Sequence, residues 1–134
     1  MSFYSSDEEN QLLKGIELCR DGHFFDAHDE WESVWQNLNG RKKLFWQSLI
    51  QFVISCYHFE NNNISGAVSM IDKAIHKANF LLDETRSDQI RELLDLFQKS
   101  RGYFSGNGTN EIDFELQKKI MENITDQLLA FENP

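Results

Sequence analysis

Histidine, glutamate and glutamine residues recur at helical spacing in two neighbouring stretches of the sequence. In the first stretch His28 and Glu32 are four residues apart, beside Trp31 and Trp35. In the second stretch, polar residues follow one another at intervals of four, four and three positions: Gln47, Gln51, Ser55 and His58. At about 100° per residue, each set falls on one face of a helix. Imidazole, carboxylate and amide groups in this arrangement can bind a metal ion, transfer a proton or hold a polar ligand.

The second stretch, residues 41–59, is apolar in almost every other direction. This pattern predicts a central buried helix over residues 41–60 that is surrounded by protein. Because an unpaired buried polar group costs about 1–3 kcal/mol, the polar residues of this helix need partners on a neighbouring one. Glu32 is also predicted to point inward, since its neighbours are aromatic. Asp29 and Glu30 are predicted to be ordinary solvated acids on the opposite face.

The short Asn39–Gly40 turn makes the two stretches antiparallel neighbours. Residues nearest the turn then pair first, so Trp35 is expected level with Gln47. Glu32 is expected level with Gln51. Farther from the turn, His28 is expected level with Ser55 or His58. We therefore predict one polar cluster, away from solvent, with Trp31 and Trp35 as its pocket aromatics and with these members: His28, Glu32, Gln47, Gln51 and His58.

Long segments with a 3.6-residue hydrophobic period, and a single proline at the last position, predict an all-α fold. We expect one domain over residues 1–134, a compact bundle of about six helices built from antiparallel helical hairpins. The expected helices cover residues 6–20, 23–38, 41–60 and 64–82, a segment that follows 85–87, and 112–131. Ser6 and Glu9 have capping-box spacing at the start of the first helix, and Gly102–Asn110 is predicted to be a loop.

Charge and composition limit the partners of the chain. The formal net charge is -9 and the basic residues form no long stripe, so nucleic acid is not expected as a partner. The basic run Arg41–Lys43 is interpreted as a solvated helix start. No stretch has transmembrane length without polar interruption and no signal peptide is recognisable, so we expect no membrane association and a cytoplasmic location. Cys19 and Cys56 are interpreted as free buried thiols in a reducing compartment.

Several of these residues form a pattern that is similar to a known family. Its parts are Phe25-Asp26-Ala27-His28-Asp29-Glu30-Trp31-Glu32-x-x-Trp35, then Gln47-x-Leu49-Ile50-Gln51, Tyr57-His58 and Asn62-x-x-x-Gly66-Ala67. Over roughly Leu12 to Leu82 the chain resembles the family catalogued as domain of unknown function 309. The family usually has glutamate, leucine and glycine where this chain has Asp29, Trp31 and Ser48. The resemblance implies a compact all-α domain and supplies no established activity.

Three hypotheses for the predicted cluster are open at this point. It could be a structural centre that fixes the register of two helices, or a binding centre for a small molecule or a protein partner. Alternatively, the chain could be a metal-dependent or general acid/base enzyme that uses His28, Glu32 and His58. The pattern requires no cofactor, although a divalent metal is compatible with it. A small, acidic, aromatic-rich domain is also compatible with a homo-oligomer.

Overall fold

The computed structural model describes residues 4–106, which form five α-helices and no strand. The helices are α1 (Ser6–Arg20), α2 (Phe24–Trp35), α3 (Gly40–Glu60), α4 (Ile64–Thr85) and α5 (Asp88–Ser105). The predicted all-α class is therefore confirmed for this part of the chain. The sixth helix, predicted at residues 112–131, lies outside the described residues.

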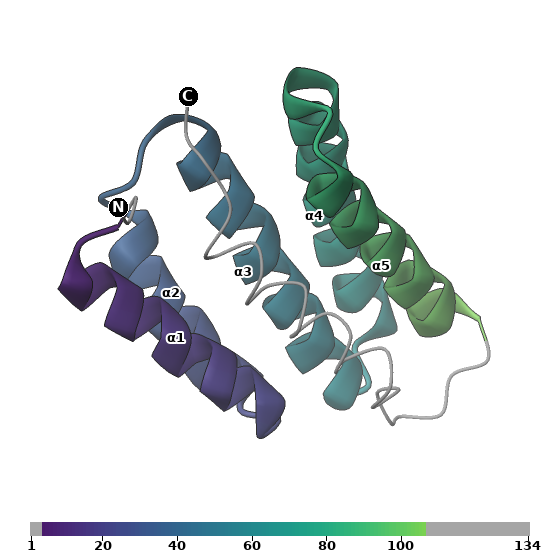
Figure 1. The fold of residues 1–134 in the computed structure, drawn as a ribbon. Coiled ribbons are helices and arrows are strands. Elements are labelled where there is room, and N and C mark those ends of the chain that lie inside the picture. The colour runs from purple at the N-terminus through teal and green to yellow at the C-terminus, as the bar shows by residue number, and fades with distance from the viewer. Residues whose placement is uncertain (1–3, 107–134) are drawn as a thin grey trace.

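The helices pack in chain order, each against the next. Short turns join α1 to α2, α2 to α3, α3 to α4 and α4 to α5, so that successive helices run in opposite directions. Figure 1 shows α3 between the α1–α2 pair and the α4–α5 pair. This arrangement confirms the antiparallel helical hairpins and the central position of the helix predicted at residues 41–60.

α3 is central because it is apolar on nearly all sides, as its buried residues show: Phe45, Trp46, Ser48, Leu49, Ile50, Phe52, Val53, Ser55, Cys56 and Phe59. The two serines in this set donate their hydroxyl groups within the helix. Ser48 donates to the carbonyl oxygen of Phe45 at 2.6 Å, and Ser55 donates to that of Phe52. The core therefore accepts both serines without an unpaired hydroxyl group.

α1 and α2 approach each other closely at Gly15. A Cβ atom at this position would overlap the indole ring of Trp31, which is fully buried. The indole nitrogen of Trp31 donates to the carbonyl oxygen of Leu12 at 2.9 Å. Because Gly15 has no side chain, the large ring of Trp31 fits between α1 and α2.

The first two helices begin and end slightly differently from the prediction. The capping box of α1 is formed by Ser5 and Glu8, one residue before the predicted pair. α2 ends at Trp35 rather than at Leu38. The amides of Asn37 and Leu38 donate to carbonyl oxygens three residues earlier, which tightens the chain into a turn before α3.

The last two described helices are longer than predicted. α4 continues to Thr85, beyond the predicted end at residue 82. α5 continues through Gly102, where the glycine-rich composition predicted a loop. The rings of Tyr103 and Phe104 pack on Phe59 of α3, with centroids 5.4 Å and 4.8 Å apart. Apolar packing of this kind keeps a helix formed where local propensity is poor.

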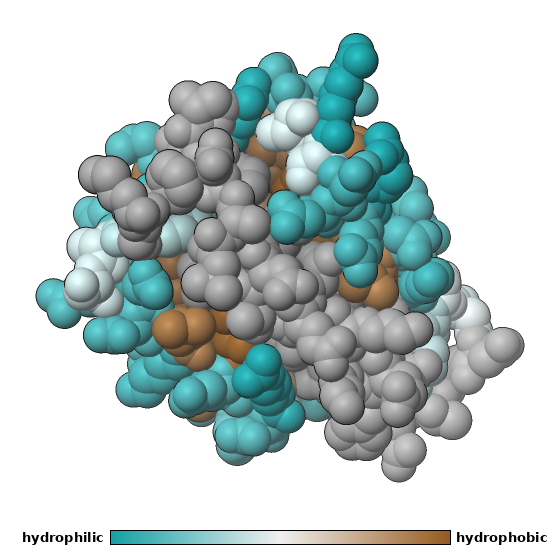
Figure 2. Space-filling view, viewed as in Figure 1, coloured by the Kyte–Doolittle hydropathy of each residue, from teal (hydrophilic) through white to brown (hydrophobic). Residues whose placement is uncertain are grey.

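The apolar residues are gathered inside, and the described surface is mostly hydrophilic. On the face drawn in Figure 2, hydrophobic residues show only in small areas. None of the described helices is long and apolar enough to span a membrane. Cys19 and Cys56 are both buried, and burial raises the pKa of each thiol.

Candidate functional site

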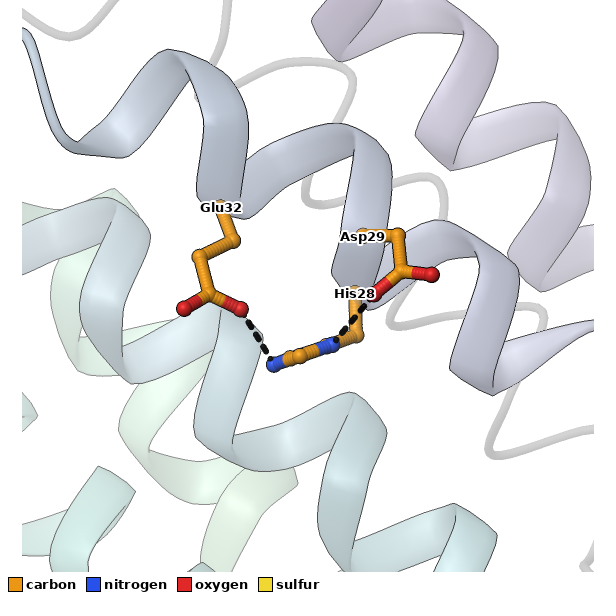
Figure 3. Close-up of side chains that lie close together, drawn as sticks. All are labelled: His28, Asp29 and Glu32. Carbon is orange, nitrogen blue, oxygen red and sulfur yellow. Dashed lines mark hydrogen bonds and ion pairs between the residues drawn. The ribbon is translucent and has the colours of Figure 1, made fainter.

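The candidate site lies on α2, along an edge next to the buried face of that helix. The buried face consists of Phe24, Ala27, Trp31 and Val34. On the adjacent edge, the imidazole ring of His28 lies between two carboxylates of the same helix (Figure 3). Its Nε2 atom is 2.9 Å from Oε2 of Glu32, and its Nδ1 atom is 3.3 Å from Oδ1 of Asp29. Both ring nitrogens of His28 are therefore engaged by acids.

The cluster of His28, Asp29 and Glu32 is open to solvent, whereas the sequence predicted a cluster inside the protein. The side chain of His28 is 21% exposed, that of Glu32 is 42% exposed and that of Asp29 is 61% exposed. The prediction that Glu32 points inward is therefore wrong. Its carboxylate lies at the margin of the core, where it meets His28 and also stays hydrated.

Asp29 belongs to the cluster, although the sequence analysis assigned it to the opposite face. The spacing of the two acids already indicates a shared side of the helix, because Asp29 and Glu32 are three residues apart, which is about 60° around a helix. A short aspartate next to His28 can reach the near nitrogen of the ring while Glu32 reaches the far one. Glu30, the other acid assigned to that face, pairs instead with Lys14 of α1 at 3.4 Å.

α2 and α3 are the antiparallel neighbours that the sequence predicted. The indole nitrogen of Trp35 donates to the carbonyl oxygen of Lys43 at 3.0 Å, close to the turn between the helices. Far from the turn, the rings of Phe25 and Tyr57 pack with their centroids 5.4 Å apart. Between these two contacts, the register brings the middle of α3, which includes Gln51, level with the part of α2 that carries the cluster.

The polar residues of α3 do not hydrogen-bond to that cluster. Gln47 and Gln51 are partly buried, and Oε1 of Gln51 has no hydrogen-bond partner among the described residues. The hydroxyl group of Ser55 is satisfied inside α3. Within residues 4–106, no hydrogen bond or ion pair joins Gln47, Gln51 or His58 to His28 or Glu32.

His58 contributes to the turn between α3 and α4. Its Nδ1 atom is 3.5 Å from the side-chain nitrogen, Nδ2, of Asn63. Its backbone carbonyl oxygen accepts a hydrogen bond from the backbone N–H of Asn63 at 2.8 Å. The side-chain oxygen of Asn63 in turn caps α4 by accepting from the backbone N–H of Gly66 at 2.9 Å. A Cβ atom at Gly66 would crowd the side chain of Asn63, which explains why a glycine suits this position.

Of the two tryptophans predicted as pocket aromatics, Trp31 belongs to the core and Trp35 packs against it. Trp31 is fully buried, and its ring lies 5.3 Å from that of Trp46 in an edge-on arrangement. Trp35 is partly buried, and the ammonium group of Lys43 lies 4.6 Å from the centre of its ring. Neither indole N–H is free to bind a ligand, because each donates to a backbone carbonyl oxygen.

Within the described part of the chain, the residues able to hold a metal ion together are His28, Asp29 and Glu32. One ligand atom from each lies within 4.8 Å of the others. His58, which the sequence suggested as the third ligand beside His28 and Glu32, is not part of this group. One imidazole nitrogen and two carboxylate oxygens form a ligand set suited to zinc and similar divalent ions.

Comparison with known proteins gives a family match and little else. Residues 12–70 match the family model described as Domain of unknown function (DUF309). This segment runs from α1 into α4, so it includes the His28 cluster and the whole of α3. No curated protein and no solved structure matches the chain. The resemblance suggested by the sequence pattern is thus confirmed.

Proposed function

We propose that this chain, which resembles DUF309 over residues 12–70, is a ligand-binding domain whose binding centre is the cluster of His28, Asp29 and Glu32. The proposed ligand is a divalent cation. The observation that supports this proposal is the convergence of three ligand atoms within 4.8 Å on one edge of α2. The cluster is partly exposed, so a cation can reach it from solvent without any opening of the core.

A purely structural role is less well supported by the same geometry. A solvent-exposed pair of charged side chains at positions i and i+4 of a helix stabilises a protein by about 0.3–0.5 kcal/mol. Glu32 and Asp29 are both substantially exposed, so their contacts with His28 fall in this weak class. The stability of the bundle comes instead from the buried face of α2 and from α3.

The glutamines of α3 complete the proposed surroundings of the cation. The register of α2 and α3 brings Gln51 level with the cluster, and its buried Oε1 atom lacks a partner among the described residues. A buried acceptor of this kind costs about 1–3 kcal/mol when it is left unpaired. In the proposed site, a water molecule bound to the cation donates to Gln51, and Gln47 borders the same side.

The alternative function, an enzyme, would need a different set of residues from the one predicted from the sequence. General acid/base chemistry by His28, Glu32 and His58 together has little support, because His58 is engaged in the turn between α3 and α4. A cation held by three side chains, however, keeps coordination positions for water and substrate. Hydrolysis assisted by a metal is therefore the reaction class that this centre would suit.

Isothermal titration of the metal-free protein with Zn²⁺, Mn²⁺ and Ni²⁺ tests the proposal. We expect one cation per chain, and we expect His28→Ala and Glu32→Gln each to weaken its binding about tenfold or more. Glu30→Gln is the matched control, because this acid is on the same helix but pairs with Lys14. Equal affinities for all four proteins, or no uptake of any of the three ions by the wild type, would overturn the assignment.

A further inference from the structure

Large hydrophobic side chains are exposed at three positions in the described part of the chain. Phe25 is 49% exposed, Ile64 is 38% exposed and Phe80 is 51% exposed. Phe25 lies in the first turn of α2, and Ile64 is the first residue of α4. Because successive helices alternate in direction, these two residues lie at the same end of the helix array. Phe80 lies in the second half of α4, away from that end.

Phe25 is fixed in place by aromatic neighbours although half of its surface meets water. Its ring centroid is 5.4 Å from that of Tyr57 on α3 and 5.7 Å from that of His28. The ring is therefore held between two helices while one side stays open. A single exposed phenylalanine is ordinary on a protein surface, so its charged surroundings must decide what it could bind.

The charged residues next to Phe25 on α2 and α3 are mostly acids, whereas Arg20 ends α1 at the same end of the array. Asp26 and Asp29 are exposed in the same part of α2, and the sequence of α2 contains no lysine or arginine. On α3, Glu60 follows Tyr57 by one turn and is also exposed. Burial of part of its surface raises the pKa of Glu60, while the neighbouring His23 acts in the opposite direction. His23, at the N-cap of α2, is thus the residue that faces Glu60 from the start of this helix.

The second exposed phenylalanine has different surroundings. Phe80 follows His76 and Lys77 by one turn of α4 and precedes Asp83 and Glu84 by one turn, so its side of the helix carries both basic and acidic residues. Burial lowers the pKa of Lys77, and the charge of Lys73 acts in the same direction. Phe25 and Phe80 therefore have nearly equal exposure but different charged neighbours, which makes Phe80 a control for any test of Phe25.

We propose that Phe25 and Tyr57, with the acids Asp26, Asp29 and Glu60, form a docking surface for an arginine-bearing segment of a partner protein. We call these five residues the Phe25 surface. A guanidinium group can stack on an exposed aromatic ring while its N–H groups donate to carboxylates beside that ring. The net charge of -9 attracts a basic segment from a distance, and the acids beside Phe25 are the groups that would hold it at this surface.

This docking surface does not depend on the cation proposed for the His28 cluster. The two sites share Asp29, but Glu32 belongs to the cation site alone and Phe25 to the docking surface alone. Glu32→Gln should therefore weaken cation binding and leave docking intact, and Phe25→Ala should do the reverse. Failure of one proposal can thus be told apart from failure of the other.

The test is a titration of the ¹⁵N-labelled chain with a tri-arginine amide, followed by amide chemical shifts at about 0.15 M salt, where long-range attraction is screened. We expect saturable shifts at residues 23–29 and 57–61. Phe25→Ala should weaken binding about tenfold, and Phe80→Ala should change it less than about twofold. Tri-lysine amide should bind more weakly, because an ammonium group stacks poorly on a ring.

Three results would overturn the docking surface. Shifts spread over every acidic face would show binding by net charge alone. Equal losses in Phe25→Ala and Phe80→Ala would show that the aromatic ring has no specific role. Shifts at residues 23–29 and 57–61 that appear on concentrating the protein without any peptide would show that a second copy of the chain covers this end, in place of a basic partner.

Discussion

The two sides of α2 differ in what they contribute to the protein. Its buried side consists of Phe24, Ala27, Trp31 and Val34, none more than 3% exposed. Its open edge carries Phe25, His28, Asp29 and Glu32, all of which meet water. Twelve residues of helix therefore divide into a side that holds the bundle together and an edge that is free to bind. The side chains of α2 that are chemically able to bind a ligand are therefore those that contribute least to the stability of the fold.

The buried side is closed further by the chain segments around it. The indole nitrogen of Trp46 donates to the hydroxyl group of Tyr4 at 2.8 Å, and Lys42 lies 4.6 Å from the centre of the Tyr4 ring. Arg41, the first residue of the basic run, pairs with Glu84 of α4 at 3.2 Å. The run predicted to be a solvated helix start thus makes specific contacts with Glu84 and with the rings of Tyr4 and Trp35.

Replacing Trp31 with alanine should have the largest effect on stability. This ring is fully buried and its N–H group is paired, so we expect a loss of about 3–5 kcal/mol in the free energy of unfolding. Phe25→Ala on the open edge should cost less than about 1 kcal/mol, because half of that ring is already in water. Urea denaturation of both variants measures the contrast. Similar losses would show that the two sides of α2 are not energetically distinct.

Tyr4 should make the closed side sensitive to alkali. Burial raises its pKa from 10.0 to about 12, although the hydrogen bond from Trp46 acts in the opposite direction. The folded state therefore holds the phenolic proton more tightly than the unfolded state does. This contribution to stability is complete below pH 10 and is lost as the pH rises through about 12, a change of roughly 2–3 kcal/mol.

The measurement for Tyr4 is the free energy of unfolding from about pH 9 to about pH 12 in the wild type and in Tyr4→Phe. The variant should be less stable at neutral pH, because the indole N–H group of Trp46 loses its acceptor. Above pH 10 the wild type should lose stability faster than the variant. Parallel curves for the two proteins would contradict the burial of the phenol.

The effect of Gly15→Ala on the free energy of unfolding should depend on the residue at position 31. In the wild type, the new methyl group would overlap the buried indole ring of Trp31, and overpacking of this kind costs about 1–3 kcal/mol. That loss exceeds the gain of up to about 1 kcal/mol that alanine brings to a helix interior. In a Trp31→Leu background the overlap is relieved, so the same change should be neutral or stabilising. A double-mutant cycle measures the coupling, and additive effects would refute it.

The order and pairing of the helices could be predicted because they follow from local signals. The Asn39–Gly40 turn and the 3.6-residue periods set α2 against α3, and the contacts from Trp35 to Lys43 and from Phe25 to Tyr57 confirm that these two helices are antiparallel neighbours. Helix ends were predicted less well where packing overrides propensity, as at Gly102 in α5.

The candidate site could be predicted only in part. A helical projection predicts the side of the helix on which a residue lies, but not how deeply its side chain is buried. The contact between His28 and Glu32 follows from their spacing, whereas the exposure of Glu32 depends on how closely the neighbouring helices cover that edge of α2. The contact of Asp29 with His28 was not predicted, because the polar face of the helix was taken to be narrower than it is. The packing of Trp31 against Gly15 depends on the distance between the backbones of α1 and α2, and no local sequence pattern predicts that distance.

Glu32→Gln should have the smallest effect on folding and the clearest effect on binding. Loss of a half-exposed pair with His28 should lower the free energy of unfolding by about 0.5 kcal/mol or less. If the open edge of α2 is a cation site, the same change removes one of three ligands, and stabilisation by added Zn²⁺ in a thermal unfolding assay should disappear. Glu30→Gln should keep that stabilisation. A loss of stability above about 1 kcal/mol without any effect of Zn²⁺ on the wild type would make Glu32 a structural residue, and the division between the two sides of α2 would fail.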